Sequence, residues 1–257
     1  MKILCLIFSW KGQYKNALKL EKQLLDSNIS TMVINSDDDN QPENWINIGN
    51  ECYFSDQFRK ALEIFNNLDY DFLWHIQADA SYDDWDSIIE SAKSSYQKYN
   101  WGVFAPNVDD TFYISERTDV FDLEDDLKLV ATTDNTCWII HKDMIKQIND
   151  NISLMEDNHL GWGWDLLLCS FAHIQKRLVI RDYKFTVNHP PSTGYKKDIA
   201  EQEMFDMFNK CPDEIRKSIY FIKQSPNNIL SYYDIDLPKT VSPVTSGFVY
   251  DTEVMFR

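Results

Sequence analysis

Acidic side chains follow a short apolar run in the stretch DFLWHIQADASYDDW, residues 71–85. The run 72–76 is typical of a buried strand, and Asp79 comes just after its end. Asp83 and Asp84 are better placed to cap the next helix. Open α/β sheets bind ligands outside the carboxyl ends of their strands, and a hard cation there requires carboxylate oxygens. Asp79 is therefore a candidate metal ligand; the alternative is that these acids only form a turn and a helix cap.

Two earlier strand ends also hold polar residues that could contact a nucleotide. The first is FSWKGQ, which contains Ser9 and Trp10 and a single glycine. One glycine is far from the Gly-rich fingerprint of a dinucleotide site or a P-loop, so a plain turn between strand and helix is favoured. The second is NSDDDN, where Asp37 or Asp38 could hydrogen-bond a ribose or a base edge. A solvated loop explains that acidic run equally well.

Two later stretches hold further candidate residues. In GWGWDLLLC, Trp162, Gly163 and Trp164 precede Asp165, which falls in the first turn of a predicted helix. Taken alone, this pattern favours an acid stabilised by the helix dipole, beside buried tryptophans. In FTVNHPPSTGYKK, His189 precedes two prolines, and Lys196 and Lys197 follow. A lone histidine is more often structural than a ligand, and the two lysines are typical of a solvated helix start that could also reach a diphosphate.

The elements that must position these residues begin with a strand–helix–strand unit. Residues 2–8 are typical of a buried strand, 14–26 of an amphipathic helix and 31–34 of a second strand, which predicts parallel strands joined by a right-handed crossover. The segment 45–54 is ambiguous. Ser55 is a candidate N-cap for the following helix. The strand 70–76, a helix starting at Asp83 or Asp84, and a strand 101–105 continue the alternation.

The second part of the chain alternates less regularly. Residues 107–126 are polar and acidic without a clear period, which predicts a long loop. Strands are predicted at 128–130, 136–140 and 178–180, and helices at 142–148, 165–175 and 197–209. With no internal repeat and no linker, we expect one domain over 1–210 and a C-terminal extension, 211–257, packed on it. The predicted fold class is α/β, a single-domain Rossmann-like mixed sheet with helices on both faces.

Composition limits the class of protein. The 257 residues are 44% hydrophobic, which is typical of a globular chain, and carry a net charge of −16. That charge argues against holding nucleic acid by a broad basic face. The start of the chain has too short an apolar run for a secretory signal, no run approaches a membrane span, and five cysteines lack a disulfide or zinc spacing. We therefore expect a cytoplasmic protein.

The order of these features resembles the fold type A glycosyltransferases, enzymes that use nucleotide sugars. In that family a D-x-D motif ends the fourth strand, and its last Asp binds a divalent metal. The matching residues are Gln77-Ala78-Asp79, so Gln replaces the first acid. The family's catalytic base, an acid at a helix start after an aromatic or Gly-rich turn, matches Asp165, and its late metal-binding histidine matches His189. The resemblance covers about residues 1–209.

The resemblance implies a mechanism and a role for each candidate. Mg²⁺ or Mn²⁺ held by Asp79 and His189 would bridge the diphosphate of the donor, and Asp165 would take the proton of an acceptor hydroxyl. An Asp base in this role implies inversion; if Asp165 only positions the acceptor, retention remains open. A UDP-sugar is the favoured donor. Donor contacts would come from Ser9, Trp10, Asp37, Asp38, Gln77, Lys196 and Lys197. Acceptor and sugar contacts would come from Asp134, Asn135, Trp162, Gly163 and Trp164. Asp134 and Asp157 are the next candidates for the base.

Three alternatives remain open at this point. A nucleotidyltransferase shares the nucleotide-binding unit and the metal-binding Asp, but usually has a Gly-rich first loop. A binding protein that has lost catalysis is favoured by Gln77. The bias toward Asn, Lys, Asp and Ile is typical of an AT-rich genome. The acceptor could therefore be a glycan or, for a phage enzyme in the host cytoplasm, hydroxymethylated bases of DNA; the charge of −16 counts against DNA.

Overall fold

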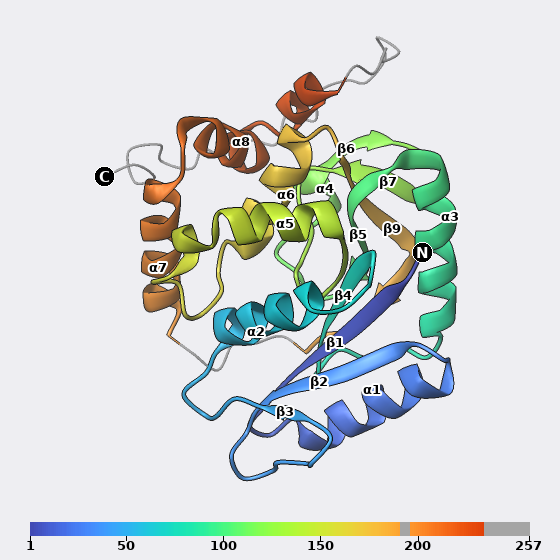
Figure 1. The fold of residues 1–257 in the computed structure, drawn as a ribbon. Coiled ribbons are helices and arrows are strands. Elements are labelled where there is room, and N and C mark those ends of the chain that lie inside the picture. Colours follow the sequence, from blue (N-terminus) through green and yellow to red (C-terminus); the bar gives the residue numbers. More distant parts are fainter. Residues whose placement is uncertain (191–195, 234–257) are drawn as a thin grey trace.

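A computed structural model describes residues 1–190 and 196–233 of the chain. The described residues form one nine-stranded mixed sheet in the order β3-β2-β1-β4-β8-β5-β9-β7-β6, with helices on both faces (Figure 1). The sequence predicted this fold class, and the structure confirms it. In the described part of the chain, no helix is both long enough and apolar enough to cross a membrane.

The first half of the sheet consists of parallel strands. Strand β1 (Ile3–Trp10), helix α1 (Tyr14–Asp26) and strand β2 (Ser30–Ser36) form the predicted unit, and β1 pairs in parallel with both β2 and β4 (Phe72–Gln77). The ambiguous segment holds a two-residue strand, β3 (Ile46–Asn47), at the sheet edge. Helix α2 (Phe54–Asn66) is capped by Tyr53, and Ser55, the predicted cap, is buried one residue inside it. These parallel strands bring the carboxyl ends of β1, β2 and β4 to one edge of the sheet.

The second half mixes strand directions. Helix α3 (Trp85–Tyr99), whose N-cap is Asp84, leads into β5 (Trp101–Val108). Strand β8 (Cys137–His141) lies between β4 and β5 and runs antiparallel to both. Strand β9 (Leu178–Val187) pairs in parallel with β5 and antiparallel with β7 (Leu127–Val130). The second half therefore does not repeat the parallel strand–helix–strand arrangement of the first half.

In this half one prediction was wrong, and one predicted strand was too short. The supposed loop 107–126 contains helix α4 (Ser115–Thr118) and strand β6 (Asp119–Asp122). Both elements have four residues, too few to show a helical or alternating period. The strand predicted over 178–180 continues to Val187. The prediction stopped early because charged Arg181, Asp182 and Lys184 interrupt the apolar pattern, although Arg181 and Asp182 are buried.

Two hydrophobic clusters fill the space above and below the sheet. On one face α1 and α3 cover Cys5 and Ile7, and on the other α2, α5 (Lys142–Asp150) and α6 (Trp164–Ile174) cover Leu4, Leu6 and Phe8. Alternate residues of β1 therefore face opposite clusters, and both are apolar because both faces are covered. Figure 1 shows α1 and α3 on the opposite side of the sheet from α2 and α5.

The chain after β9 packs against α6. Helix α7 (Lys197–Lys210), helix α8 (Asp213–Gln224) and the 3-10 helix η2 (Pro226–Tyr232) bury apolar side chains in the same cluster as α6, and a short 3-10 helix, η1 (Ile152–Met155), joins them. The buried residues of α8 and η2 are Ile215, Ile219, Ile222 and Ile229. The described part of the predicted extension, 211–233, thus packs on the sheet domain. Residues 234–257 lie outside the described residues, and the division at 210 stays a prediction.

Candidate functional site

Asp79 and His189 meet at the carboxyl edge of the sheet, although 110 positions separate them in the sequence. Asp79 lies two residues beyond β4 and His189 two residues beyond β9. The Nε2 atom of His189 is 3.5 Å from Oδ1 of Asp79, and their side chains are 16% and 10% exposed. The two residues expected to share a metal ion are therefore neighbours in a nearly buried position.

Main-chain hydrogen bonds hold this pair together. Ser81 and Asn188 form an isolated antiparallel bridge, with N–H to carbonyl distances of 2.9 and 3.0 Å, which ties the segment after β4 to the end of β9. The amide of His189 also donates to Oδ1 of Asp109 at 2.5 Å. The two residues thus reach each other across the ends of β8 and β5, which lie between β4 and β9 in the sheet.

The surroundings of Asp79 disfavour a lone negative charge. Burial raises the pKa of its carboxyl, His189 acts in the opposite direction, and the charge of Asp134 raises that pKa further. The Oδ1 atom is buried and has no hydrogen-bond partner among the described residues. A buried carboxylate oxygen without a hydrogen bond, 3.5 Å from an imidazole nitrogen, fits the oxygen and nitrogen donors of a divalent cation. Within residues 1–190 and 196–233, no cluster of three or more His, Cys, Asp or Glu side chains could hold a metal, so a ligand would have to complete the coordination.

Asp134 is a third carboxylate, close enough to interact electrostatically with both Asp79 and Asp165. It follows β7, and its carboxylate accepts hydrogen bonds from Thr111 Oγ1 at 2.6 Å and from the amide and hydroxyl of Thr136 at 2.8 and 2.7 Å. Its charge contributes to raising the pKa of both Asp79 and Asp165. Asn135, the next residue, is partly exposed beside it. The structure thus gathers three carboxylates at one edge of the sheet.

Asp165 lies in the first turn of α6 and is 6% exposed. Its Oδ1 accepts the amide of Leu166 at 2.8 Å, and its Oδ2 accepts a short hydrogen bond from the hydroxyl of Tyr113. Burial raises the pKa of Asp165 to about 6, although both hydrogen bonds favour the charged form, and Asp134 adds to the rise. A carboxyl with a pKa of about 6 suits proton transfer near neutral pH better than one with the ordinary value.

The two glycines before Asp165 are required by the turn that presents it. Gly161 and Gly163 both have a φ of +88°, a left-handed conformation that favours glycine. A Cβ on Gly161 would lie 2.3 Å from Cδ1 of Phe54, and one on Gly163 would lie 2.7 Å from Cγ of Met204 in α7. The turn can therefore pack against α2 and α7 only because both positions lack a side chain.

The two tryptophans of this turn have different surroundings. Trp164 is 1% exposed, donates from Nε1 to Ser55 Oγ at 2.8 Å and packs against Phe58. The expectation that Trp164 stacks on a sugar ring does not fit this position, because its indole fills the core between α2 and α6. Trp162 is partly exposed, so it is the tryptophan of this turn that a sugar ring could reach.

The structure places the expected donor-binding residues at the ends of β1, β2 and β4. Ser9 is fully buried and its Oγ has no hydrogen-bond partner among the described residues, whereas Trp10 and Gln77 are partly exposed. Asp37 is buried and accepts hydrogen bonds from the Asp39 amide and the Asn40 side chain at 3.0 and 2.9 Å, which fold its own loop. Asp38 is exposed. Its two oxygens accept hydrogen bonds from the Gln41 side chain and the Asn50 amide at 3.1 and 3.2 Å, so Asp38 differs from Asp37 in its exposure and not in lacking partners.

Sequence reasoning missed several residues of this edge. Tyr113, Thr111 and Asp109 belong to the segment that was predicted as a loop without a role. Lys223, near the end of α8, is partly buried; burial lowers its pKa, while Asp165 and Glu201 act to raise it. No sequence motif marks Lys223, which lies in the predicted extension. The expected diphosphate-binding residues Lys196 and Lys197 are exposed at the start of α7, where Lys197 pairs with Glu201 at 3.6 Å.

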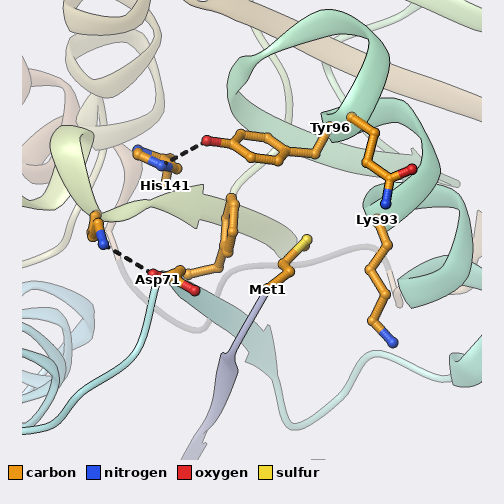
Figure 2. Close-up of a pocket in the computed structure, with 8 residues that line it drawn as sticks. Met1, Asp71, Lys93, Tyr96 and His141 are labelled. Atoms are coloured by element: carbon orange, nitrogen blue, oxygen red, sulfur yellow. Dashed lines mark hydrogen bonds and ion pairs between the residues drawn. The ribbon is translucent and has the colours of Figure 1, made fainter.

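A hollow of about 490 Å³ lies at the opposite edge of the sheet. It is lined by residues at the start of β1 and β4, the end of β8 and the side of α3, namely Met1, Asp71, Phe72, Lys93, Tyr96, Gln97, His141 and Lys142 (Figure 2). Two pairs of its polar groups contact each other: the Tyr96 hydroxyl is 3.0 Å from Nε2 of His141, and Lys142 pairs with Asp71 at 2.9 Å. The hollow contains none of the predicted site residues.

Comparison with known proteins identifies the fold but not the family. No protein-family model and no curated protein matched the sequence. Among solved structures, TarS of S. aureus has a TM-score of 0.53 at 12% identity, over 81% of this chain and 38% of TarS. A shorter TarS structure, residues 1–349, gives 0.49 at 11% identity over 86% of this chain and 72% of that one. A CMP:2-keto-3-deoxy-manno-octonic acid synthetase with CTP gives 0.47 at 11%, over 79% and 97%. The likeness to TarS supports the predicted sheet architecture, and at these identities it shows the fold alone.

Proposed function

We propose that this protein is a glycosyltransferase that moves a sugar from a nucleoside diphosphate sugar, with a UDP-sugar as the favoured donor, to an acceptor hydroxyl. The observation that carries the proposal is the meeting of Asp79 and His189 at the carboxyl edge of the sheet, with Asp134 in electrostatic reach of both Asp79 and Asp165. The likeness of the fold to TarS, a glycosyltransferase, agrees with it. In fold type A glycosyltransferases a metal ligand, a base and a late histidine follow one another along the chain, and Asp79, Asp165 and His189 have the same order here.

Asp79 and His189 would hold a Mg²⁺ or Mn²⁺ ion. Bound there, such an ion would neutralise negative charge on the diphosphate oxygens. The unpaired Oδ1 of Asp79 and the neighbouring imidazole fit this role, and oxygens of the donor diphosphate would complete the ligand set that the described protein residues leave short. Gln77 and Asp38, at the ends of β4 and β2, lie on the same edge and would contact the sugar and the ribose.

Asp165 would act as the general base. The acceptor oxygen attacks the anomeric carbon as its proton passes to the Asp165 carboxylate, and the bond from that carbon to the diphosphate oxygen breaks, releasing the nucleoside diphosphate. With a pKa near 6, Asp165 is mostly charged at pH 7 and still a stronger base than an ordinary aspartate. An acid–base role on the face opposite the leaving group implies inversion at that carbon. Trp162, Asn135 and Asp134 would contact the acceptor or the transferred sugar.

Binding of a nucleotide that depends on a metal and on Asp79 tests this proposal. Calorimetric titration of UDP with Mn²⁺ should show binding to the wild-type protein that is lost in Asp79→Asn, because the carboxylate serves the ligand rather than the core. Asp71→Asn is the matched control, since Asp71 is a carboxylate just before the same strand and pairs with Lys142. Equal affinity of wild type and Asp79→Asn, or equal losses in both variants, would contradict the proposed site.

A further inference from the structure

Arg181 is a buried cation whose hydrogen bonds converge on the candidate site. It lies in β9, is 2% exposed, and its guanidinium donates to the carbonyl of Tyr113 at 2.7 Å and to the carbonyl of Thr132 at 2.9 Å. It also donates to Thr118 Oγ1 and to the hydroxyl of Tyr183, both at 3.1 Å. A guanidinium that replaces its water shell with carbonyl and hydroxyl oxygens holds those oxygens in a fixed arrangement.

The two carbonyls belong to the two segments that present the site residues. The segment around Tyr113 supplies the hydroxyl that bonds Asp165, and its Thr111 bonds Asp134 at 2.6 Å. The segment starting at Thr132 leads directly into Asp134. One side chain of β9 therefore ties together the main chain on either side of the candidate carboxylates.

Tyr113 carries this connection to Asp165. Its hydroxyl donates to Oδ2 of Asp165, while the amide of Leu166 donates to Oδ1. Burial, together with the charge of Asp165, raises the pKa of the Tyr113 phenol well above its ordinary value, so this hydroxyl stays a donor. Each carboxylate oxygen has two lone pairs, so one on each remains for an acceptor hydroxyl. The two donors fix the plane in which the carboxylate lies.

We propose that Tyr113 and Arg181 form one positioning unit for the Asp165 carboxylate, in which Arg181 fixes the Tyr113 main chain and the Tyr113 hydroxyl fixes Oδ2. The catalytic role of this unit rests on the proposed function, because both residues would act through Asp165. The unit itself predicts a property of Asp165 that does not require any substrate.

That property is the proton affinity of Asp165. Within the described part of the chain, the titratable groups in electrostatic reach of Asp165 are Tyr113, Asp134, Cys169 and Lys223. Removing the Tyr113 hydroxyl takes away a hydrogen bond that stabilises the charged carboxylate and leaves the burial unchanged. The pKa of Asp165 should then rise above its value near 6.

The test is a direct titration of the Asp165 carboxyl by carbon-13 NMR in the full chain, for wild type, Tyr113→Phe, Arg181→Lys and Tyr183→Phe. We expect the midpoint to move upward by roughly half to one pH unit in Tyr113→Phe. A smaller upward shift is expected in Arg181→Lys, because lysine cannot bond both carbonyls in a fixed fork. Tyr183→Phe, which removes a partner of Arg181 that does not reach Asp165, should leave the midpoint within a tenth or so of a pH unit.

A kinetic arm connects the unit to the proposed reaction. In a transferase assay, Tyr113→Phe should lower kcat, leave the KM of the donor unchanged, and move the acidic limb of the pH profile upward with the NMR midpoint. An unchanged midpoint in folded Tyr113→Phe would overturn the positioning unit. Should Tyr113→Phe not fold, an unchanged midpoint in Arg181→Lys overturns it instead. A shifted midpoint in a protein without transferase activity would retain the unit and reject the proposed function.

Discussion

The two ends of strand β4 differ in how their charged groups are paired. At the amino end, beside the hollow of about 490 Å³, Lys142 pairs with Asp71 and Lys93 with Glu90, and His141 contacts the Tyr96 hydroxyl. At the carboxyl end, Asp79 has a buried oxygen with no hydrogen-bond partner among the described residues, and burial raises the pKa of Asp165 to about 6. The hollow and the candidate chemistry are thus at opposite ends of the same strand.

Buried carboxyls with raised pKa values and the hollow thus point to different edges of the sheet, and the proposed function rests on the former. Leaving a buried polar group without a partner costs about 1–3 kcal/mol, more for a charged group, so folded proteins rarely retain one without a ligand to bind it. Groups with strongly shifted pKa values collect at functional sites for the same reason. Asp182 contrasts with Asp79: it is also buried with a raised pKa, but Ser91 and the amide of Lys184 donate to both of its oxygens.

The largest effect is expected for turnover in Asp165→Asn. If Asp165 is the base, its loss should lower kcat by roughly 10²–10⁴ and leave donor affinity intact, because the proposed metal ligands are elsewhere. Asp182→Asn is the matched control, since it also removes a buried carboxylate but on the far face of the sheet. The assay is product formation with any acceptor that supports turnover. Turnover of Asp165→Asn within tenfold of wild type would exclude it as the base and make Asp134 the next candidate.

A smaller effect is expected for nucleotide binding in His189→Ala. One neutral ligand of several is lost, so affinity for UDP with Mn²⁺ should fall by about tenfold, less than in Asp79→Asn. Calorimetric titration measures this, and His159→Ala, at an exposed position, is the control. If circular dichroism shows that His189→Ala is unfolded, the histidine has a structural role. The carboxyl end of β4 would then lose one of its two proposed metal ligands.

The pH dependence of stability should also reflect Asp165. Its folded pKa, about 6, lies above its ordinary 3.8, so its protonated form favours the folded state and stability is lost as pH rises from about 4 to 6. At about 1.4 kcal/mol per pH unit, the ionised group costs roughly 3 kcal/mol at pH 7. Asp165→Asn should therefore raise the free energy of unfolding at pH 7, by up to that amount, and flatten the curve between pH 4 and 6. Denaturant unfolding at several pH values measures this.

A drop in stability for Asp165→Asn at pH 7 would contradict that prediction. It would mean that the hydrogen bonds from Tyr113 and Leu166 outweigh the effect of burial. The helix-start interpretation of Asp165 would then account for its position in α6.

The smallest effect is expected at the other end of β4. Lys142 is half exposed, so Lys142→Gln should leave the melting temperature within about 2 °C of wild type, because exposed ion pairs contribute little to stability. It should leave UDP binding unchanged in the same calorimetric titration. Weakened nucleotide binding in Lys142→Gln would indicate that the nucleotide binds in the hollow at the amino end of β4 and not at the carboxyl end.

The sequence by itself determined the local elements and the candidate acids. The period of α1 and the apolar runs of β1 and β4 predicted the first parallel unit, because burial on one or both sides of an element repeats with its geometry. Asp79 and Asp165 were found because each directly follows or begins such an element, which places it at a strand end or a helix start. Short elements without a measurable period, such as α4 and β6, were missed, and Tyr113 was missed with them.

Only the tertiary structure decided which of these residues meet and how they are charged. The contact of Asp79 with His189 depends on β8 and β5 lying between β4 and β9 and on the bridge from Ser81 to Asn188, and no local pattern encodes that pairing. The pKa of Asp165 depends on α6 packing under Tyr113 and on Asp134 arriving from another loop. Burial and strand order are set by contacts between distant segments, so a helix-start acid could be recognised in the sequence, but its proton affinity could not.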